Sequence, residues 1–253
     1  MPVEPAAPID LVLVVDVGNS SAKVGAVRGD DVAGPVRLPA PDAKSVRAFA
    51  EPMLKGHKAL IAVCGSQPGK AKDLAWELGK LKLGQAVAID SDHPGVPRPK
   101  VAQPERAGMD RRVQALAARY LASGPAVVIS CGTAITVDLA DEEGALAGGA
   151  ILPGLMLGMK ALASGTALLP EVSLEGPVVM PALDTETAIR TGLVLGAAGA
   201  VDRLLAESGV PASRPLFLTG ADAKLLAPHL GRAHRLHPGL GLLGIAIAAR
   251  QRR

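Results

Sequence analysis

A short pattern that occurs twice, about half a chain length apart, constrains the fold of these 253 residues more than any other feature. In the first copy, the β-branched run 11–15 leads into a Gly-Asn-Ser turn within 16–21, and a second apolar run follows over 22–27. In the second copy, the run 127–130 leads through a Cys-Gly-Thr turn into the apolar run 135–139. Two strands joined by a tight glycine turn form a hairpin. Because both halves open with the same hairpin, the sequence predicts a duplicated α/β domain.

The residues between and after the hairpins alternate between helical and strand periodicity. We expect helices over 45–54, 71–81, 110–121, 155–163, from Asp184 or Thr185 to about residue 208, and over 240–250, with further strands over 60–63, 86–89, 148–154 and 215–218. The segment 90–108 is rich in proline and charge and is expected to be a loop. With a hinge near 121–125, the predicted lobes are 1–121, which holds the first turn, and 122–253, which holds the second.

Composition excludes several classes of protein. Lysine and arginine exceed aspartate and glutamate by only 27 to 24, and the few aromatic residues (2%) are scattered. A nucleic-acid-binding face would concentrate basic residues and stacking aromatics, so no nucleic-acid partner is expected. Two cysteines in apolar stretches do not make a disulfide scaffold, and no apolar run reaches the ~18–20 residues of a membrane-spanning helix. We expect a cytoplasmic protein without a membrane partner.

The first turn contains groups that a phosphoryl-transfer site needs, namely phosphate-binding donors and an acid near the metal. Gly18 lets the backbone approach an oxyanion closely, while Asn19 and Ser20 can donate hydrogen bonds to it. Asp16 can organise Mg²⁺ through water, and Lys23 would add positive charge near the phosphates. The alternative is an ordinary hairpin whose turn residues serve only its geometry.

A second candidate segment, Gly108-Met109-Asp110-Arg111, opens a helix after the proline-rich loop. In one interpretation, Asp110 is an acid at a helix N-terminus, where the helix dipole favours it. In the other, Asp110 is a base that accepts a proton from a substrate hydroxyl, and Arg111 binds an anionic group of the same substrate.

Taken together, the segments resemble the type III pantothenate kinases of the acetate and sugar kinase, Hsp70 and actin superfamily. The resemblance covers nearly the whole chain, because its segments occur in the family's order and spacing. They are 16–23, 108–111, 132–138 (GTAITVD), 148–170, 185–192 (TETAIRTG), Thr219-Gly220, and 237–244 near the end.

The resemblance implies an α/β fold of duplicated actin-like (ribonuclease H-like) domains with a cleft between two lobes. It implies ATP-dependent phosphorylation of the primary hydroxyl of pantothenate to 4'-phosphopantothenate, in coenzyme A biosynthesis. Mg²⁺ and a monovalent cation such as K⁺ or NH₄⁺ would be the cofactors, and the protein would be a homodimer. The spacing of Gly192, Gly196 and Gly199 fits close helix packing at a dimer interface, or equally inside one subunit.

The resemblance also implies a role for each matching residue. Asp110 is the general base, and Thr185 reaches the substrate across the dimer interface. Asp16 is the Mg²⁺ position, and Ser130 stands at the family's monovalent-cation position. The residues that would contact ATP are Asp16, Val17, Gly18, Asn19, Ser20, Ser21, Ala22, Lys23 and Thr133, and those that would line the pantothenate pocket are Gly108, Met109, Asp110 and Arg111.

Three positions depart from the family's pattern. Ser130 replaces an aspartate that would hold the monovalent cation, and symmetry with Asp16 also favours an acid there. Val101 stands where many members have a tyrosine beside pantothenate, and Ala221 replaces a glycine on the nucleotide side. Two alternatives therefore stay open: a non-catalytic relative that acts as an accessory transcription factor, and a kinase for another small hydroxylated metabolite.

Overall fold

The computed structural model describes residues 11–18, 21–39, 42–54, 59–65, 67–81 and 83–251. The chain forms two compact units, the first made of Met1–Ala117 with Gly239–Arg253 and the second of Ala118–Pro238. Each unit contains a five-stranded sheet. The last helix thus groups with the first half of the chain. The division into functional lobes at residue 121 stays a prediction.

The sheet of the first unit has the strand order β3-β2-β1-β4-β5. Its strands are β1 (Leu11–Val17), β2 (Ala22–Arg28), β3 (Asp31–Leu38), β4 (Ala59–Gly65) and β5 (Gly84–Ile89). The first three form an antiparallel meander, whereas β4 and β5 run parallel to β1. Parallel neighbours require crossover connections, and the helices α1 (Ala43–Leu54) and α2 (Pro68–Lys80) supply them.

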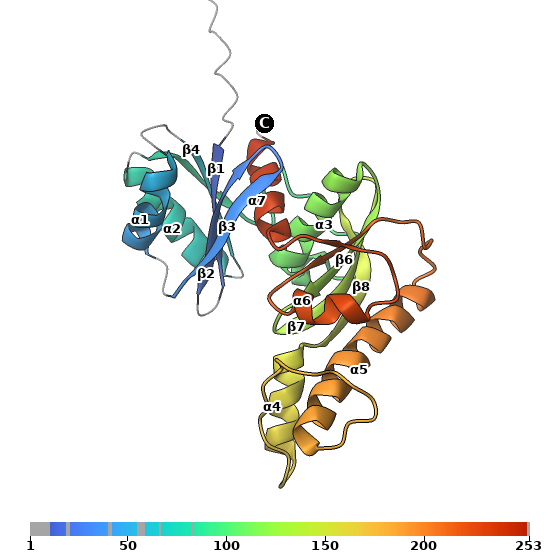
Figure 1. Cartoon of the computed structure of the whole chain (residues 1–253). Helices are drawn as coiled ribbons and strands as arrows, with labels where there is room; N and C mark the ends of the chain where they lie inside the picture. The colour runs from blue at the N-terminus through green and yellow to red at the C-terminus, as the bar shows by residue number, and fades with distance from the viewer. Residues whose placement is uncertain are drawn as a thin grey trace, which may run out of the picture. The chain divides into compact units, whose positions relative to one another are not determined.

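Helices cover both faces of this sheet, which explains why β1 and β4 are almost continuously apolar. The helices α1 and α2 lie together on one face (Figure 1), where Val46, Leu74 and Leu78 pack against Val15 and Ile61. The closing helix, α7 (Leu240–Arg250), contacts all five strands. It also packs on α3 (Met109–Ala122), which follows the short 3-10 helix η1 (Pro104–Arg106).

The sheet of the second unit repeats the topology of the first, in the order β10-β9-β6-β7-β8. Its strands are β6 (Ala126–Cys131), β7 (Ala134–Ala140), β8 (Leu146–Pro153), β9 (Leu216–Thr219) and β10 (Arg235–Leu236). As in the first sheet, the meander β6-β7-β8 is antiparallel, and β9 and β10 are parallel additions. The predicted duplication is confirmed, with β1, β2 and β4 equivalent to β6, β7 and β9.

The equivalence extends to a close backbone contact in each sheet. A Cβ atom on Gly65, at the end of β4, would collide with the backbone of Val17 at the end of β1. A Cβ atom on Gly220, just after β9, would collide with the backbone of Cys131 at the end of β6. Glycine therefore lets the chain leave the parallel strand directly beside the hairpin turn in both copies.

The core of the second unit lies between its sheet and the helices that follow the hairpin. These are α4 (Leu155–Gly165), α5 (Thr185–Glu207), α6 (Ala223–Leu226) and the 3-10 helix η2 (Ala227–His229). Figure 1 shows α4 and the first half of α5 side by side, and Met159 and Ile189 form a small apolar cluster between them. The predicted cap of α5 is confirmed, because the Asp184 carboxylate accepts a 2.8 Å hydrogen bond from the Thr187 amide.

The predicted helices and strands are all present, with bounds that differ by a few residues. The strands β3 and β10, the short helix α6 and the 3-10 helices η1 and η2 were not predicted, and η1 lies in the segment 90–108 that was expected to be a loop. Most residues of β3 are exposed, so this strand lacks the apolar alternation by which strands are recognised. Among the helices that the structure describes, none has the length and apolar composition that a membrane crossing would need.

Candidate active site

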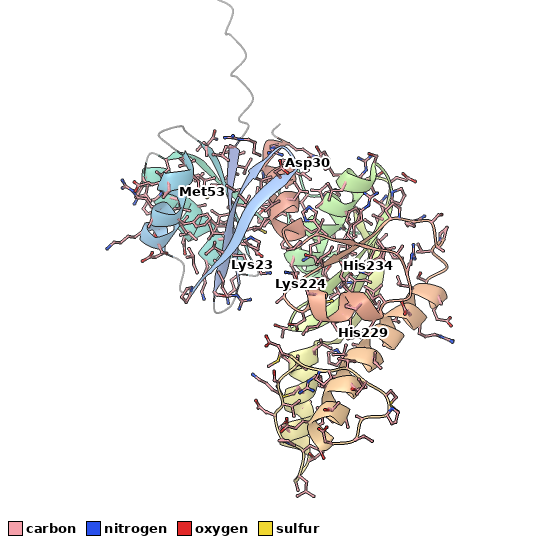
Figure 2. All side chains as sticks on the ribbon, viewed as in Figure 1. Lys23, Asp30, Met53, Lys224, His229 and His234 are labelled. Atoms are coloured by element: carbon pink, nitrogen blue, oxygen red, sulfur yellow. The ribbon has the colours of Figure 1, made fainter. Side chains whose placement is uncertain are left out.

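The first unit places Asp16 between two reactive side chains on adjacent strands. In the sheet register, Asp16 lies opposite Lys23 on β2 and opposite Cys64 on β4. Residues directly opposite one another point to the same face, with Cβ atoms about 5 Å apart in an antiparallel pair. Lys23 is at the start of β2, next to the hairpin turn (Figure 2). The carboxylate, the ammonium group and the thiol therefore form one row.

Asp110, from the first turn of α3, lies close enough to this row to affect it electrostatically. Burial raises the pKa of Asp16, the Lys23 ammonium opposes this rise, and the negative charge of Asp110 adds to it. Burial also raises the pKa of the Cys64 thiol to about 12, with further contributions from the charges of Asp16 and Asp110. The structure thus brings together Asp16, Lys23 and Asp110, which the sequence singled out separately.

The hairpin turn itself depends on Gly18. Its amide donates a 2.9 Å hydrogen bond to the carbonyl oxygen of Ser21, and a Cβ atom at Gly18 would lie only 2.9 Å from that oxygen. The flanking residues Val17 and Ala22 are buried, so they anchor the turn at the end of the sheet. The predicted phosphate donors Asn19 and Ser20 lie outside the described residues.

Gly108 leaves room for the Asp110 carboxylate. A Cβ atom on Gly108 would be 2.5 Å from Asp110 Oδ1, so the carboxylate occupies the space that any larger residue would fill. The Gly108 carbonyl accepts a 3.2 Å hydrogen bond from the Arg112 amide, closing the first turn of α3 around Met109, Asp110 and Arg111. Asp110 is exposed, which leaves its carboxylate accessible to a substrate.

The equivalent row in the second unit consists of hydroxyl groups. Ser130 occupies the position of Asp16, and it lies opposite Thr136 on β7 and Thr219 on β9. The Thr136 hydroxyl donates a 2.6 Å hydrogen bond to Oδ2 of Asp138, whose side chain is fully buried. The duplication has therefore kept the geometry of the row while exchanging its charges for neutral groups.

Two turns border this second row. The amide of Gly132 donates to the carbonyl oxygen of Ala134 at 3.0 Å, which leaves Thr133 exposed at the tip of the hairpin. After β9, Gly220 has a φ of 101°, and the Asp222 amide donates to the Cys131 carbonyl at 3.2 Å. Since Gly220 supplies the left-handed residue of that turn, the exchange of the next glycine for Ala221 does not prevent it from forming.

Thr185 is the first residue of α5 and is exposed beside its cap, Asp184. On the same helix, Gly192, Gly196 and Gly199 are exposed, and a Cβ atom at any of them would meet no atom within 4 Å. Within the subunit, the glycine stripe is therefore not needed for close packing.

The donor groups present are compatible with a magnesium ion that arrives with a nucleotide. In the parts of the chain that are described, His, Cys, Asp and Glu side chains form no group of three or more that could hold a metal. Magnesium in kinases is held by one or two carboxylates, water and substrate phosphates. Asp16 supplies a hard oxygen donor of this kind.

Two polar residues of the rows, Cys64 and Thr136, and Asp222 in the turn after β9 were not predicted from the sequence. The duplication could have indicated Cys64, because this residue of β4 corresponds to Thr219 of β9. Asp222 is partly buried, which raises its pKa, and its charge helps to raise the pKa of the buried Cys131 to about 12.

Two duplicated sheets of this topology define an actin-like α/β protein, and solved structures show the same fold. A hexokinase of the ROK type from Thermus thermophilus covers 94% of this chain and 98% of its own, with a TM-score of 0.51 and 16% identity. A protein from Campylobacter jejuni described as belonging to the Baf family of transcriptional activators has a TM-score of 0.57 and 21% identity, covering 93% and 96%.

The sequence comparisons identify the family within this class. The family model described as type III pantothenate kinase matches residues 12–207. A type III pantothenate kinase from Frankia alni is 31% identical over 247 residues, which are 94% of this chain and 98% of the relative. The chain therefore belongs to the type III pantothenate kinase family.

Proposed function

We propose that this protein transfers the γ-phosphoryl group of ATP to the primary hydroxyl of pantothenate, giving 4'-phosphopantothenate for coenzyme A biosynthesis. One observation carries the proposal: Asp16 lies opposite Lys23 at the end of β1, within electrostatic reach of Asp110, in a chain of the type III pantothenate kinase family. Phosphoryl transfer depends on positioned charges and an oriented hydroxyl rather than on covalent chemistry by the protein.

In this proposal, Asp110 is the general base. Its exposed carboxylate can accept the proton of the acceptor hydroxyl, while Gly108, Met109 and Arg111 contact the rest of pantothenate. Arg111 supplies a cation for the carboxylate of that substrate. General-base catalysis of this kind contributes roughly 10²–10⁴-fold to the rate.

The turn from Asp16 to Lys23 holds the ATP phosphates in this proposal. The narrow turn at Gly18 allows close backbone approach, and the Lys23 ammonium adds positive charge at its base. A Mg²⁺ ion organised by Asp16 would neutralise charge that develops on the phosphoryl oxygens. Thr133, at the tip of the corresponding turn in the second unit, contacts ATP as well.

We propose further that the enzyme is a homodimer in which Thr185 reaches the substrate of the partner subunit. The open glycine stripe on α5 supports this assembly, as do three side chains from the segment between α4 and α5. Leu168, Met180 and Leu183 are 91%, 81% and 95% exposed in the single chain, and a partner subunit would cover them.

Release of ADP from ATP and Mg²⁺ across a titration of pantothenate tests the proposal. Saturable, pantothenate-dependent ADP formation is expected. No release above background with any acceptor would favour the non-catalytic alternative. ADP release with another hydroxylated acceptor but not with pantothenate would instead favour a different substrate. Val101, which stands where many family members have a tyrosine beside pantothenate, would be in agreement with that outcome.

A further inference from the structure

Arg112 is a buried cation that the proposed mechanism does not use. It is the fourth residue of α3, directly after Asp110 and Arg111, and only 3% of it is exposed. Burying a guanidinium group is unfavourable unless hydrogen bonds and nearby opposite charges compensate it. The contacts of this side chain therefore indicate what it stabilises.

The guanidinium group joins two parts of the first unit. Its Nη2 atom donates to the carbonyl oxygen of Ser91 at 3.0 Å and to that of Pro97 at 3.3 Å. Its Nη1 atom contacts the sulfur of Met109 at 3.5 Å, whereas the buried Nε atom has no hydrogen-bond partner. One side chain thus fastens both ends of the loop 91–97 to the first turn of α3.

The loop 91–97 is itself held in place by hydrogen bonds, an ion pair and packing. Inside it, the Val96 amide donates to the His93 carbonyl at 2.9 Å, and the Gly95 amide donates to His93 Nδ1 at 3.1 Å. Its start is held by an ion pair of 2.9 Å between Asp90 and Lys72 on α2. A Cβ atom at Gly95 would collide with the backbone of Ala248 on α7, so the loop is packed against that helix without a gap.

Nearby charges favour the buried cation. Burial lowers the pKa of Arg112, while the negative charges of Asp92 and Asp90 act in the opposite direction. Arg112 also lies near Cys64, which is next to Asp16 in the sheet register. The support for the first turn of α3 therefore lies near the row that contains Asp16.

We propose that Arg112 is a positioning residue that holds the first turn of α3, and with it the Asp110 carboxylate, in the place that phosphoryl transfer requires. The inference rests on the proposed function of Asp110. Helix ends fray readily because their first amides lack partners within the helix. A displacement of about 1 Å at a reacting group can cost on the order of 10²-fold in rate.

Kinetics of Arg112→Met and Arg112→Lys, each alone and combined with Asp110→Asn, test the proposal. We expect Arg112→Met to lower kcat by roughly 10–100-fold, with KM for ATP changed less than twofold. Arg112→Lys should recover part of the loss, because its ammonium can still donate to one carbonyl. In the Asp110→Asn background, neither change should lower the residual turnover further, since the group to be positioned is gone.

Arg250→Met is the matched control. Arg250 also donates to backbone carbonyls within the first unit, those of Gly29 at 3.0 Å and Val27 at 3.4 Å, but at the opposite end of β2 from Lys23. Its replacement should leave kcat unchanged. The proposal would be overturned if Arg112→Met lowered kcat by the same factor alone and in the Asp110→Asn background, or if it left kcat unchanged. If Arg112→Met does not fold, kcat of Arg112→Lys is compared in the same two backgrounds instead.

Hydrogen exchange gives a readout that does not depend on activity. In Arg112→Lys, the amides whose hydrogen bonds close the first turn of α3, beginning with that of residue 112 to the Gly108 carbonyl, should exchange faster than in the unmodified protein, whereas those of β1 and β4 should keep their protection. Unchanged exchange in the first turn would overturn the proposal. Absent turnover in the unmodified protein would contradict the proposed function instead, so the two failures are distinguishable.

Discussion

At the scale of single residues, the two copies of the hairpin differ in charge at equivalent positions. The first row contains Asp16, Lys23 and Cys64. The second contains the hydroxyl groups of Ser130, Thr136 and Thr219. An ionised carboxylate that is partly buried is unfavourable for folding. A partly buried carboxylate at Asp16 is explained if its charge is needed to bind a metal ion and phosphates.

Replacing Asp16 with Asn should therefore stabilise the fold while weakening the binding of ATP with Mg²⁺. Burial raises the pKa of Asp16 above its ordinary value of 3.8, so the folded protein binds this proton more readily than the unfolded chain. The wild-type carboxylate thus lowers stability at pH 7, and this effect disappears as the pH falls below 3.8.

Thermal unfolding between pH 7 and pH 3.5 checks this prediction. At pH 7, the midpoint of Asp16→Asn should lie above that of the unmodified protein. Each kcal/mol by which the removal of the partly buried charge stabilises the fold should raise the midpoint by about 2–4 °C. The difference should shrink toward acid pH. Asp73→Asn, at an exposed position on α2, is the control and should give no such pattern. A lower midpoint for Asp16→Asn at pH 7 would contradict the explanation.

Ser130 leads to a prediction about cations. A K⁺ ion needs several oxygen ligands and compensation of its charge, and a serine hydroxyl supplies one oxygen without charge. We expect little gain in turnover from K⁺ over Na⁺ or a bulky organic cation at matched ionic strength. Ser130→Asp should create or strengthen a dependence on K⁺. Strong, saturable activation of the unmodified enzyme by K⁺ would refute this expectation.

At the scale of elements, the sequence predicts the hairpins and most helices because each has a local signal. The hairpin of β1 and β2 follows from its β-branched runs and Gly18, and the start of α5 follows from the capping residue Asp184. Contacts between elements have no such signal. Neither the nearness of Asp110 to Asp16 nor the burial of Arg112 could be predicted, because each depends on how α3 packs against strands and loops.

The packing of α7 against α3 can be tested with one methyl group. A Cβ atom at Gly244 would collide with the backbone carbonyl of Val113, so Gly244→Ala should destabilise the protein by about 1–3 kcal/mol. Gly69→Ala on α2 is the control, because a Cβ atom there meets nothing within 4 Å. That change should be neutral or slightly stabilising. Urea unfolding that ranks the two variants in the reverse order would contradict the observed packing.

At the scale of the whole molecule, duplication gives a framework in which one copy can specialise. The two sheets share strand order, direction and the close glycine contacts, while the residues in their rows diverge. We propose that the exposed apolar side chains of Leu168, Met180 and Leu183 are covered by the partner subunit in a homodimer.

Light scattering at micromolar concentration checks the proposed assembly. A mass of about twice 25.6 kDa is expected, because the open stripe on α5 and its apolar surroundings would then be covered. Gly196→Arg should shift the mass toward one chain, whereas an arginine at exposed Gly69 on α2 should not. A mass of one chain for the unmodified protein would count against the dimer and against a role for Thr185 in a partner's site.

In the proposed mechanism, Asp110 activates the acceptor hydroxyl for phosphoryl transfer from ATP. The rate of 4'-phosphopantothenate formation by the unmodified protein and by Asp110→Asn, with nucleotide affinity measured for both, tests this role. We expect Asp110→Asn to bind ATP normally and keep its fold, but to form product roughly 10²–10⁴-fold more slowly. A variant that binds ATP and retains nearly the full rate would contradict the role of Asp110 as general base.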